Sequence, residues 1–312
     1  MDAEIKEFIE KNIDLIEHGE FEELYQALNN RYKVPNLTET LLGADINPAR
    51  YMKEIPKRYL QDSTIQSYVI PNGINAIGDR AFENCSELTD ITIPNSVSTI
   101  GYHAFAYCKR LTSVTIGNNV TVINVSAFSN CSSLTDITIP DSVTSIGDSA
   151  FYKCSGLTSV TIGNGVTSIG YSTFYKCNAL ASITIPDSVT SIGNLAFYNC
   201  IGLTSVTIGN SVTSIGNSAF YGCSSLTSIT IPDGVTSIGS WAFIGCSSLT
   251  SITIPNSVIS IGGDAFTYTK NLESINYLGT KDQWNKIKLK PLWNADSRIE
   301  KVECTDGVIE LK

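Results

Sequence analysis

Cysteine recurs every 23 residues along much of the chain, and regularly spaced thiols could form disulfides, bind a metal or carry out redox chemistry. The column comprises Cys85, Cys108, Cys131, Cys154, Cys177, Cys200, Cys223 and Cys246. If each period is one coil of a stack, neighbouring cysteines have parallel Cβ vectors, which do not suit a disulfide dihedral angle. No C-x-x-C motif or adjacent histidine supplies a convergent zinc site. We expect a buried column of small apolar side chains, with redox chemistry and metal binding as the alternatives.

Hydrolytic chemistry is the next class to consider, because serine is abundant in the chain. A serine nucleophile needs a base, and the two histidines, His18 and His103, have no evident Ser or Asp partner. The glycines recur at one phase of the repeat, and no G-x-x-x-x-G-K-[ST] motif cradles a phosphate. The sequence therefore predicts a protein that is not an enzyme and that has no cofactor and no metal.

The elements that position these residues come from a 23-residue repeat, which runs without insertion from Ile65 to Asn271. One unit, residues 88–110, reads LTDITIPNSVSTIGYHAFAYCKR. The Ile-Thr-Ile alternation predicts a strand with one buried face, and the proline that follows ends it. Gly147 and its equivalents predict a sharp bend with positive φ. One coil cannot bury its own apolar face, so the coils must stack.

The consensus L-x-x-I-x-I-P-x-x-V-x-x-I-G-x-x-A-F-x-x-C resembles the BspA-like leucine-rich repeat, which is the Treponema pallidum type of that superfamily. The resemblance covers about two thirds of the chain. It implies an α/β solenoid of nine 23-residue coils with a parallel β-sheet on the concave side. The convex side would carry short strands or single helical turns. For many members the resemblance also implies adhesion or host interaction, usually at the cell surface.

A longer period of 46 residues lies inside the repeat. Coils with isoleucine and proline in the strand alternate with coils that have valine and glycine there. The proline-type coils carry Pro94, Pro140 and Pro186, and the glycine-type coils carry Gly117, Gly163 and Gly209. The alternation ends at Pro232 and Pro255, which lie in consecutive coils. The unit over this stretch is therefore a pair of coils.

The two ends of the chain depart from the repeat. Residues 1–62 have helical apolar spacing and predict an N-terminal helical domain, either a cap on the first coil or a docking domain. Residues 63–271 are the predicted solenoid. Residues 272–312 predict a C-terminal cap with a short helix and a hairpin, with Trp284 and Trp293 packed on the last coil.

Two columns of side chains are candidates for binding. The first follows the buried phenylalanines and consists of Tyr152, Tyr175, Tyr198 and Tyr221. These tyrosines suit contacts with a protein or a glycan, or form a ladder that only stacks on itself. The second lies on the outer face of the strands and consists of Asp90, Thr115, Asp136, Thr138, Thr161, Thr184, Thr207, Thr230 and Thr253. Threonine is also a good strand residue, so this column needs no function to explain it.

Net charge and hydropathy exclude some classes of partner. A net charge of −9 argues against nucleic acid, and no apolar run reaches the length of a membrane span. The absence of a leader favours a cytoplasmic protein, with the cell surface or secretion as the alternative. We expect a leucine-rich repeat scaffold for protein–protein interaction or adhesion. The alternatives are an assembly component docked through residues 1–62 and carbohydrate or ice binding by the Thr/Ser face.

Overall fold

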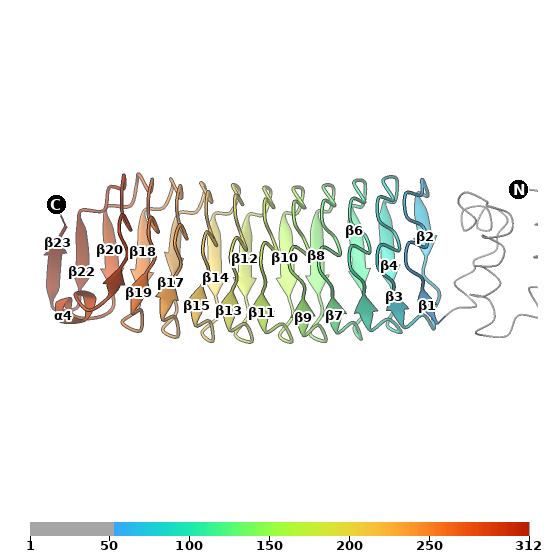
Figure 1. The fold of residues 1–312 in the computed structure, drawn as a ribbon, viewed down its shortest axis with the longest axis horizontal. Helices are drawn as coiled ribbons and strands as arrows, with labels where there is room; N and C mark the ends of the chain where they lie inside the picture. Colours follow the sequence, from blue (N-terminus) through green and yellow to red (C-terminus); the bar gives the residue numbers. More distant parts are fainter. Residues whose placement is uncertain (1–52, 312) are drawn as a thin grey trace, which may run out of the picture.

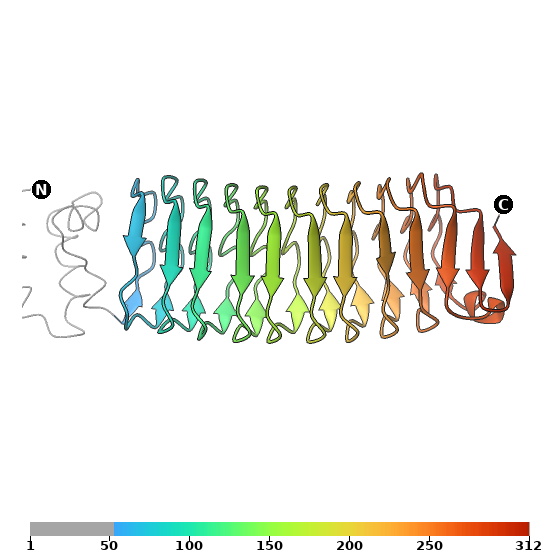
Figure 2. The same ribbon diagram turned by 180° about the vertical axis from the view of Figure 1, so that it is seen from behind.

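The computed structural model describes residues 53–311, which form a β-solenoid of about 11 turns stacked into a rod (Figures 1 and 2). The helical domain predicted for residues 1–62 lies outside the described residues up to position 52. The stack already begins inside that predicted domain, because strand β1 (Glu54–Ile55) pairs with β3 (Ala76–Ile77). It also continues beyond residue 271, through the C-terminal strands described below.

The first side of the solenoid is built from the longer strands, one per turn. Their pairing is parallel and, up to β20, in register at 23-residue spacing, as in the pairs Thr92↔Thr115 and Thr138↔Thr161. Isoleucine or valine alternates with threonine, so one face of each strand is buried and the other exposed. The strands are β2 (Ser67–Val69), β4 (Asp90–Ile93), β6 (Ser113–Ile116), β8 (Asp136–Ile139), β10 (Ser159–Ile162), β12 (Ser182–Ile185), β14 (Ser205–Ile208), β16 (Ser228–Thr230), β18 (Ser251–Ile254), β20 (Ser274–Tyr277) and β22 (Lys301–Cys304).

The second side consists of two-residue strands that pair in the same parallel manner, except that β9 and β11 are not paired with each other. Each ends on a buried apolar residue that points into the core, apart from the last strand, whose residues are exposed. After β1 and β3 come β5 (Thr99–Ile100), β7 (Val122–Ile123), β9 (Ser145–Ile146), β11 (Ser168–Ile169), β13 (Ser191–Ile192), β15 (Ser214–Ile215), β17 (Ser237–Ile238), β19 (Ser260–Ile261) and β21 (Lys288–Leu289).

The third side is a run of turns that contains no helix in the repeat. Two residues of each run, such as Ser126 and Asn130, have left-handed φ angles of 57° and 60°, which interrupts any helical hydrogen-bond pattern. The freed amides bond to the next coil: the Phe128 amide donates to the Ala150 carbonyl at 2.8 Å. The α/β class expected from the sequence is therefore corrected to a β-solenoid, because amides that bond to the next coil alternate with amides that bond three residues back, and this pattern forms no helix.

The core of the rod is made of identical side chains stacked from coil to coil. The phenylalanine rings lie nearly parallel, with centroids 5.0 Å apart for Phe82 and Phe105 and 5.6 Å apart for Phe128 and Phe151. The rings are fully buried, and each packs on its copy in the next coil. The fixed 23-residue period thus becomes a continuous apolar core, since neighbouring coils supply each other's buried surface.

The bend glycines correct a second expectation. Gly101, Gly193 and Gly216 lack the positive φ that the sequence predicted. A Cβ built on Gly216 would instead lie 2.6 Å from the main chain of Gly193 and Asn194 in the preceding coil. Glycine is therefore required here by the close approach of consecutive coils and not by its own conformation.

The C-terminal end adds a helix and a hairpin to the stack. Helix α4 (Lys281–Trp284) starts with a capping box formed by Thr280 and Gln283. Strand β22 pairs with β20 in parallel and with β23 (Gly307–Glu310) in antiparallel orientation. Trp284 and Trp293 are buried, and the Trp293 ring meets Phe266 of the phenylalanine column edge-on at 6.1 Å. No helix among residues 53–311 is long and apolar enough to span a membrane.

Candidate binding surfaces

The outer face of the long strands carries the threonine column singled out in the sequence. The threonines of β6 to β16 are exposed, and Thr253 of β18 is half-buried. Asp90 and Asp136 are also exposed, and each carboxylate accepts a hydrogen bond of 2.9 Å from the hydroxyl of the preceding threonine, Thr89 or Thr135. The structure therefore brings the predicted strand-face residues together in one continuous stripe.

This face is divided into pairs of coils. At the entry to each long strand, a main-chain amide donates to the carbonyl one coil earlier, and the N···O distance alternates along the rod. Within the pairs it is 2.8 Å for Thr112 to Thr89, 2.8 Å for Thr158 to Thr135 and 2.9 Å for Thr204 to Ala181. Between the pairs it is 3.3 Å for Thr135 to Thr112, 3.5 Å for Ala181 to Thr158 and 3.3 Å for Thr227 to Thr204.

The strand ladders follow the same alternation. Strands β4 and β6, β8 and β10, and β12 and β14 form complete ladders. The ladder is interrupted between β6 and β8 and between β10 and β12, and β14 shares a single residue pair with β16. We call these junctions seams. They fall where a glycine-type coil precedes a proline-type coil, so the 46-residue period of the sequence is also a period of the structure.

Two features of the chain explain where the seams fall. Proline at the end of a strand has no amide hydrogen, so Pro140 cannot donate back across the seam as Gly163 donates to Ile139 at 2.9 Å within the pair. A side chain also clamps each pair, since Asp141 Oδ1 accepts from the Asn164 amide at 2.7 Å. Proline alone does not open a seam, because β16 and β18 pair fully although both coils are of the proline type.

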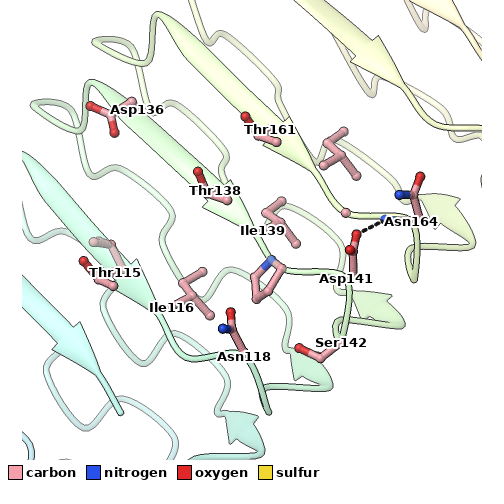
Figure 3. Close-up of a pocket in the computed structure, with 14 residues that line it drawn as sticks. Thr115, Ile116, Asn118, Asp136, Thr138, Ile139, Asp141, Ser142, Thr161 and Asn164 are labelled. Carbon is pink, nitrogen blue, oxygen red and sulfur yellow. Dashed lines mark hydrogen bonds between the residues drawn. The ribbon is translucent and has the colours of Figure 1, made fainter. Parts of the chain in front are cut away.

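A hollow of about 720 Å³ lies on this face, centred on the proline-type coil of β8 (Figure 3). Asp136 and Thr138 line it from β8, while Thr115 and Thr161 line it from the neighbouring strands. The ends of the three strands add Asn118, Asp141 and Asn164, and the clamp between Asp141 and Asn164 forms one wall. The site combines hydroxyl, amide and carboxylate groups above apolar strand residues.

A second hollow of about 710 Å³ has nearly the same lining, displaced by 46 residues. Thr184, Asp187 and Asn210 occupy the positions that Thr138, Asp141 and Asn164 occupy in the first. In both hollows the glycine-type strands are less covered than the proline-type strands: Val160 and Ile162 are 8% and 9% exposed, whereas Ile137 and Ile139 are 2% and 0% exposed. The double period therefore produces two equivalent sites.

Sequence reasoning found the strand residues of these hollows but missed the residues at the strand ends. Asn118, Asp141, Asn164 and Asp187 directly follow the alternating Gly or Pro, and they recur with the 46-residue period. That recurrence was the available signal. Their clamp role becomes visible only from the hydrogen bonds between coils.

The tyrosine column lies on the turn side and stacks upon itself. Ring centroids are 4.7 Å apart for Tyr152 and Tyr175, 4.8 Å for Tyr175 and Tyr198, and 4.5 Å for Tyr198 and Tyr221. All four side chains are half-buried, and burial together with the neighbouring tyrosines raises the pKa of Tyr175 and Tyr198. The stacked rings cover each other's faces, so a ligand would meet mainly ring edges and hydroxyl groups.

The burial predicted for the cysteine column is confirmed. All eight cysteines are buried, and none of them forms a disulfide. Sγ of Cys154 donates to the Phe128 carbonyl at 3.1 Å, and the other members make the same kind of contact to a carbonyl about one coil earlier. Burial raises the pKa of Cys154 to about 12, which opposes formation of the reactive thiolate. Among residues 53–311 no cluster of His, Cys, Asp or Glu could hold a metal ion.

The histidines contribute no recognisable catalytic group in the part of the chain that the structure describes. His18 lies outside that part. His103 is half-buried in a left-handed turn with φ of 54°, and its Nδ1 atom is buried without a hydrogen-bond partner. The His103 side chain is thus partly covered in the folded coil.

Comparison with known proteins matches the chain to a family. The model of the BspA-type leucine-rich repeat region, with 6 copies, matches residues 53–181 and 167–288. No curated protein matches the chain.

The chain is also similar to solved structures of other leucine-rich repeat proteins. A leucine-rich repeat protein from Bacteroides ovatus is 32% identical with a TM-score of 0.54, over 65% of this chain and 59% of that one. This chain therefore spans less than two thirds of that relative. A leucine-rich cell surface protein from Faecalibacterium prausnitzii is 33% identical with a TM-score of 0.45, over 76% and 80% of the two chains. The T. pallidum leucine-rich repeat protein is 24% identical with a TM-score of 0.38, over 70% and 81%.

Proposed function

This chain belongs to the BspA-type leucine-rich repeat family, and from that premise we propose that it is a non-enzymatic scaffold whose long-strand face binds a protein partner or an adhesion target. The observation that carries the proposal is the pair of equivalent hollows on this face. Each offers hydroxyl, amide and carboxylate groups beside the slightly exposed apolar side chains of the glycine-type strands. Two linked contacts of modest strength give a higher overall affinity than either contact alone.

The charge of the face indicates the chemistry of the partner. Asp136 and Asp141 line the first hollow, and Asp187 lines the second. Strands β4 to β18 contain no lysine or arginine. A partner that presents lysine, arginine or amide donors at the spacing of two coils would complement this surface.

The test is site-specific photocrosslinking in the full chain. A photoreactive residue replaces Thr138 or Thr184 in the hollows, and in matched controls it replaces Thr144 or Thr190, which are exposed threonines just before the short strands. We expect one and the same crosslinked partner from the two hollow positions and none from the controls. Crosslinks confined to Thr144 and Thr190 would show that binding uses another side of the rod.

A further inference from the structure

A groove on the turn side of the rod collects a large share of the positive charge of the coils. Between residues 65 and 271 the chain has 6 lysines and arginines. Three of them, Lys109, Lys153 and Lys176, line one hollow of about 420 Å³. The hollow lies before the long strands begin, so it is at the opposite end of these strands from the hollows described above.

The groove runs along the rod between two columns of side chains. One wall is formed by the residue before each cysteine and comprises Tyr107, Asn130, Lys153 and Lys176. The other wall is formed by the residue after each cysteine and comprises Lys109, Ser132, Ser155 and Asn178. Four successive coils contribute, so at a strand spacing of about 4.8 Å the groove is roughly 14 Å long.

The lysines of the groove are not neutralised by carboxylates. Among residues 53–311, the ion pairs of the coils join Lys57 to Asp79, Arg80 to Glu83 and Arg110 to Glu87, and none involves the three groove lysines. Neither wall contains an acidic residue. Lys153 and Lys176 instead lie over the rings of Tyr152 and Tyr175, at 5.1 and 5.6 Å from the ring centroids, which holds both ammonium groups beside the groove.

The backbone at these positions makes lysine an unfavourable choice for stability. Lys153 and Lys176 have left-handed φ angles of 57° and 56°. Such a conformation costs roughly 1–2 kcal/mol for residues other than glycine, and asparagine tolerates it best of the rest. Five other coils follow that preference, with Asn84, Asn130, Asn199, Gly222 and Gly245 at the same position, whereas two coils carry Tyr107 and Tyr268 there. The backbone conformation therefore does not explain why lysine occupies these two positions.

We propose that this groove binds an acidic polysaccharide, with the three lysines contacting its carboxylate or sulfate groups. The serine and asparagine side chains of the walls are suited to sugar hydroxyls, and the elongated groove suits a linear chain of a few sugars. The walls offer few apolar anchors for a peptide. The site does not depend on the proposed protein-binding face.

The test measures binding of the full chain to four defined probes. These are a polyuronate oligosaccharide, a sulfated oligosaccharide of equal length, a neutral oligosaccharide of that length, and polyglutamate of equal charge. We expect one of the two acidic oligosaccharides to bind, and the better one identifies the anionic group. Binding should weaken with salt, because cations on the protein displace counterions. Failure of both, or equally tight binding of polyglutamate, would overturn the proposal.

Matched variants locate the site. K153N/K176N introduces the residue that other coils already carry in this conformation, so it should fold at least as stably as the parent chain, as checked by thermal unfolding. We expect it to lose at least about tenfold in affinity and to show a shallower salt dependence. K153R/K176R should retain binding, and K270N, which removes a lysine outside the hollow, should leave the affinity unchanged. Unchanged binding by K153N/K176N would contradict the assignment.

Discussion

At the scale of single residues, burial removes the chemistry that the cysteine column suggests. Each thiol donates to a main-chain carbonyl and lies in the apolar core, so it acts as a small packing residue. Burial also opposes ionisation of the thiols. The stability of the rod therefore depends on pH in the alkaline range. The chemistry of the chain therefore lies in its exposed columns.

The thiol column predicts a loss of stability in alkali. An ordinary thiol has a pKa of 9.0, whereas burial raises the pKa of Cys154 to about 12. Between these values the unfolded chain has released a proton that the folded chain keeps, so the free energy of unfolding falls as pH rises. Each such thiol contributes up to about 1.4 kcal/mol per pH unit. The measurement is urea unfolding at pH values below and above 9.0, for the parent chain and for Cys154→Ser.

The serine variant supplies the control because its hydroxyl does not titrate in this range. We expect Cys154→Ser to be less stable near neutral pH but to lose stability less steeply above pH 9.0. Parallel pH curves for the two chains would mean that the thiol does not titrate differently in the folded and unfolded states.

At the scale of elements, the distance between coils depends on the glycine column. The main chain of one coil passes so close to the next that a side chain at Gly216 would meet backbone atoms of Gly193 and Asn194. Asn124 is the exception in the column, and its Nδ2 donates to the Ile100 carbonyl at 3.0 Å. The main chains of consecutive coils are therefore closest at the glycines, whereas the coil at Asn124 leaves room for a side chain that bonds to the preceding coil.

Gly216→Ala should lower the free energy of unfolding by about 3 kcal/mol, at the upper end of overpacking effects, because the main chain that it meets cannot rotate away. Asn124→Ala keeps a Cβ that this position already accommodates and should cost about 1 kcal/mol through its lost hydrogen bond. Chemical denaturation of both variants compares them directly. Equal losses would show that the close approach at Gly216 relaxes without cost.

At the scale of the whole molecule, the 23-residue period was enough to predict a stack of coils, a buried phenylalanine and cysteine core and an exposed threonine face. Those features follow from spacing alone, because equal spacing places equal residues in register. The left-handed turns at Ser126 or Lys153 could not be predicted, since neither residue type prefers that conformation. The lysine groove could not be predicted either, because the residues before and after a cysteine form the two walls of one groove only in the folded coil.

The paired coils are the feature on which the two equivalent hollows depend. On the long-strand face the hydrogen bonds at the strand entries are short within each pair and longer across the seams, where the strand ladder is interrupted or reduced to one residue pair. A rod built this way has a repeating surface whose unit is two coils. The 46-residue period of the sequence is thus expressed in the backbone as well as in the side chains.

Amide hydrogen exchange measured residue by residue tests this pairing most directly. The amides of Thr135, Ala181 and Thr227 donate across seams, whereas those of Thr112, Thr158 and Thr204 donate within pairs. We predict exchange about tenfold faster at the seam amides, which corresponds to an opening free energy lower by about 1.4 kcal/mol. Equal exchange rates in the two sets would contradict the division of the rod into paired coils.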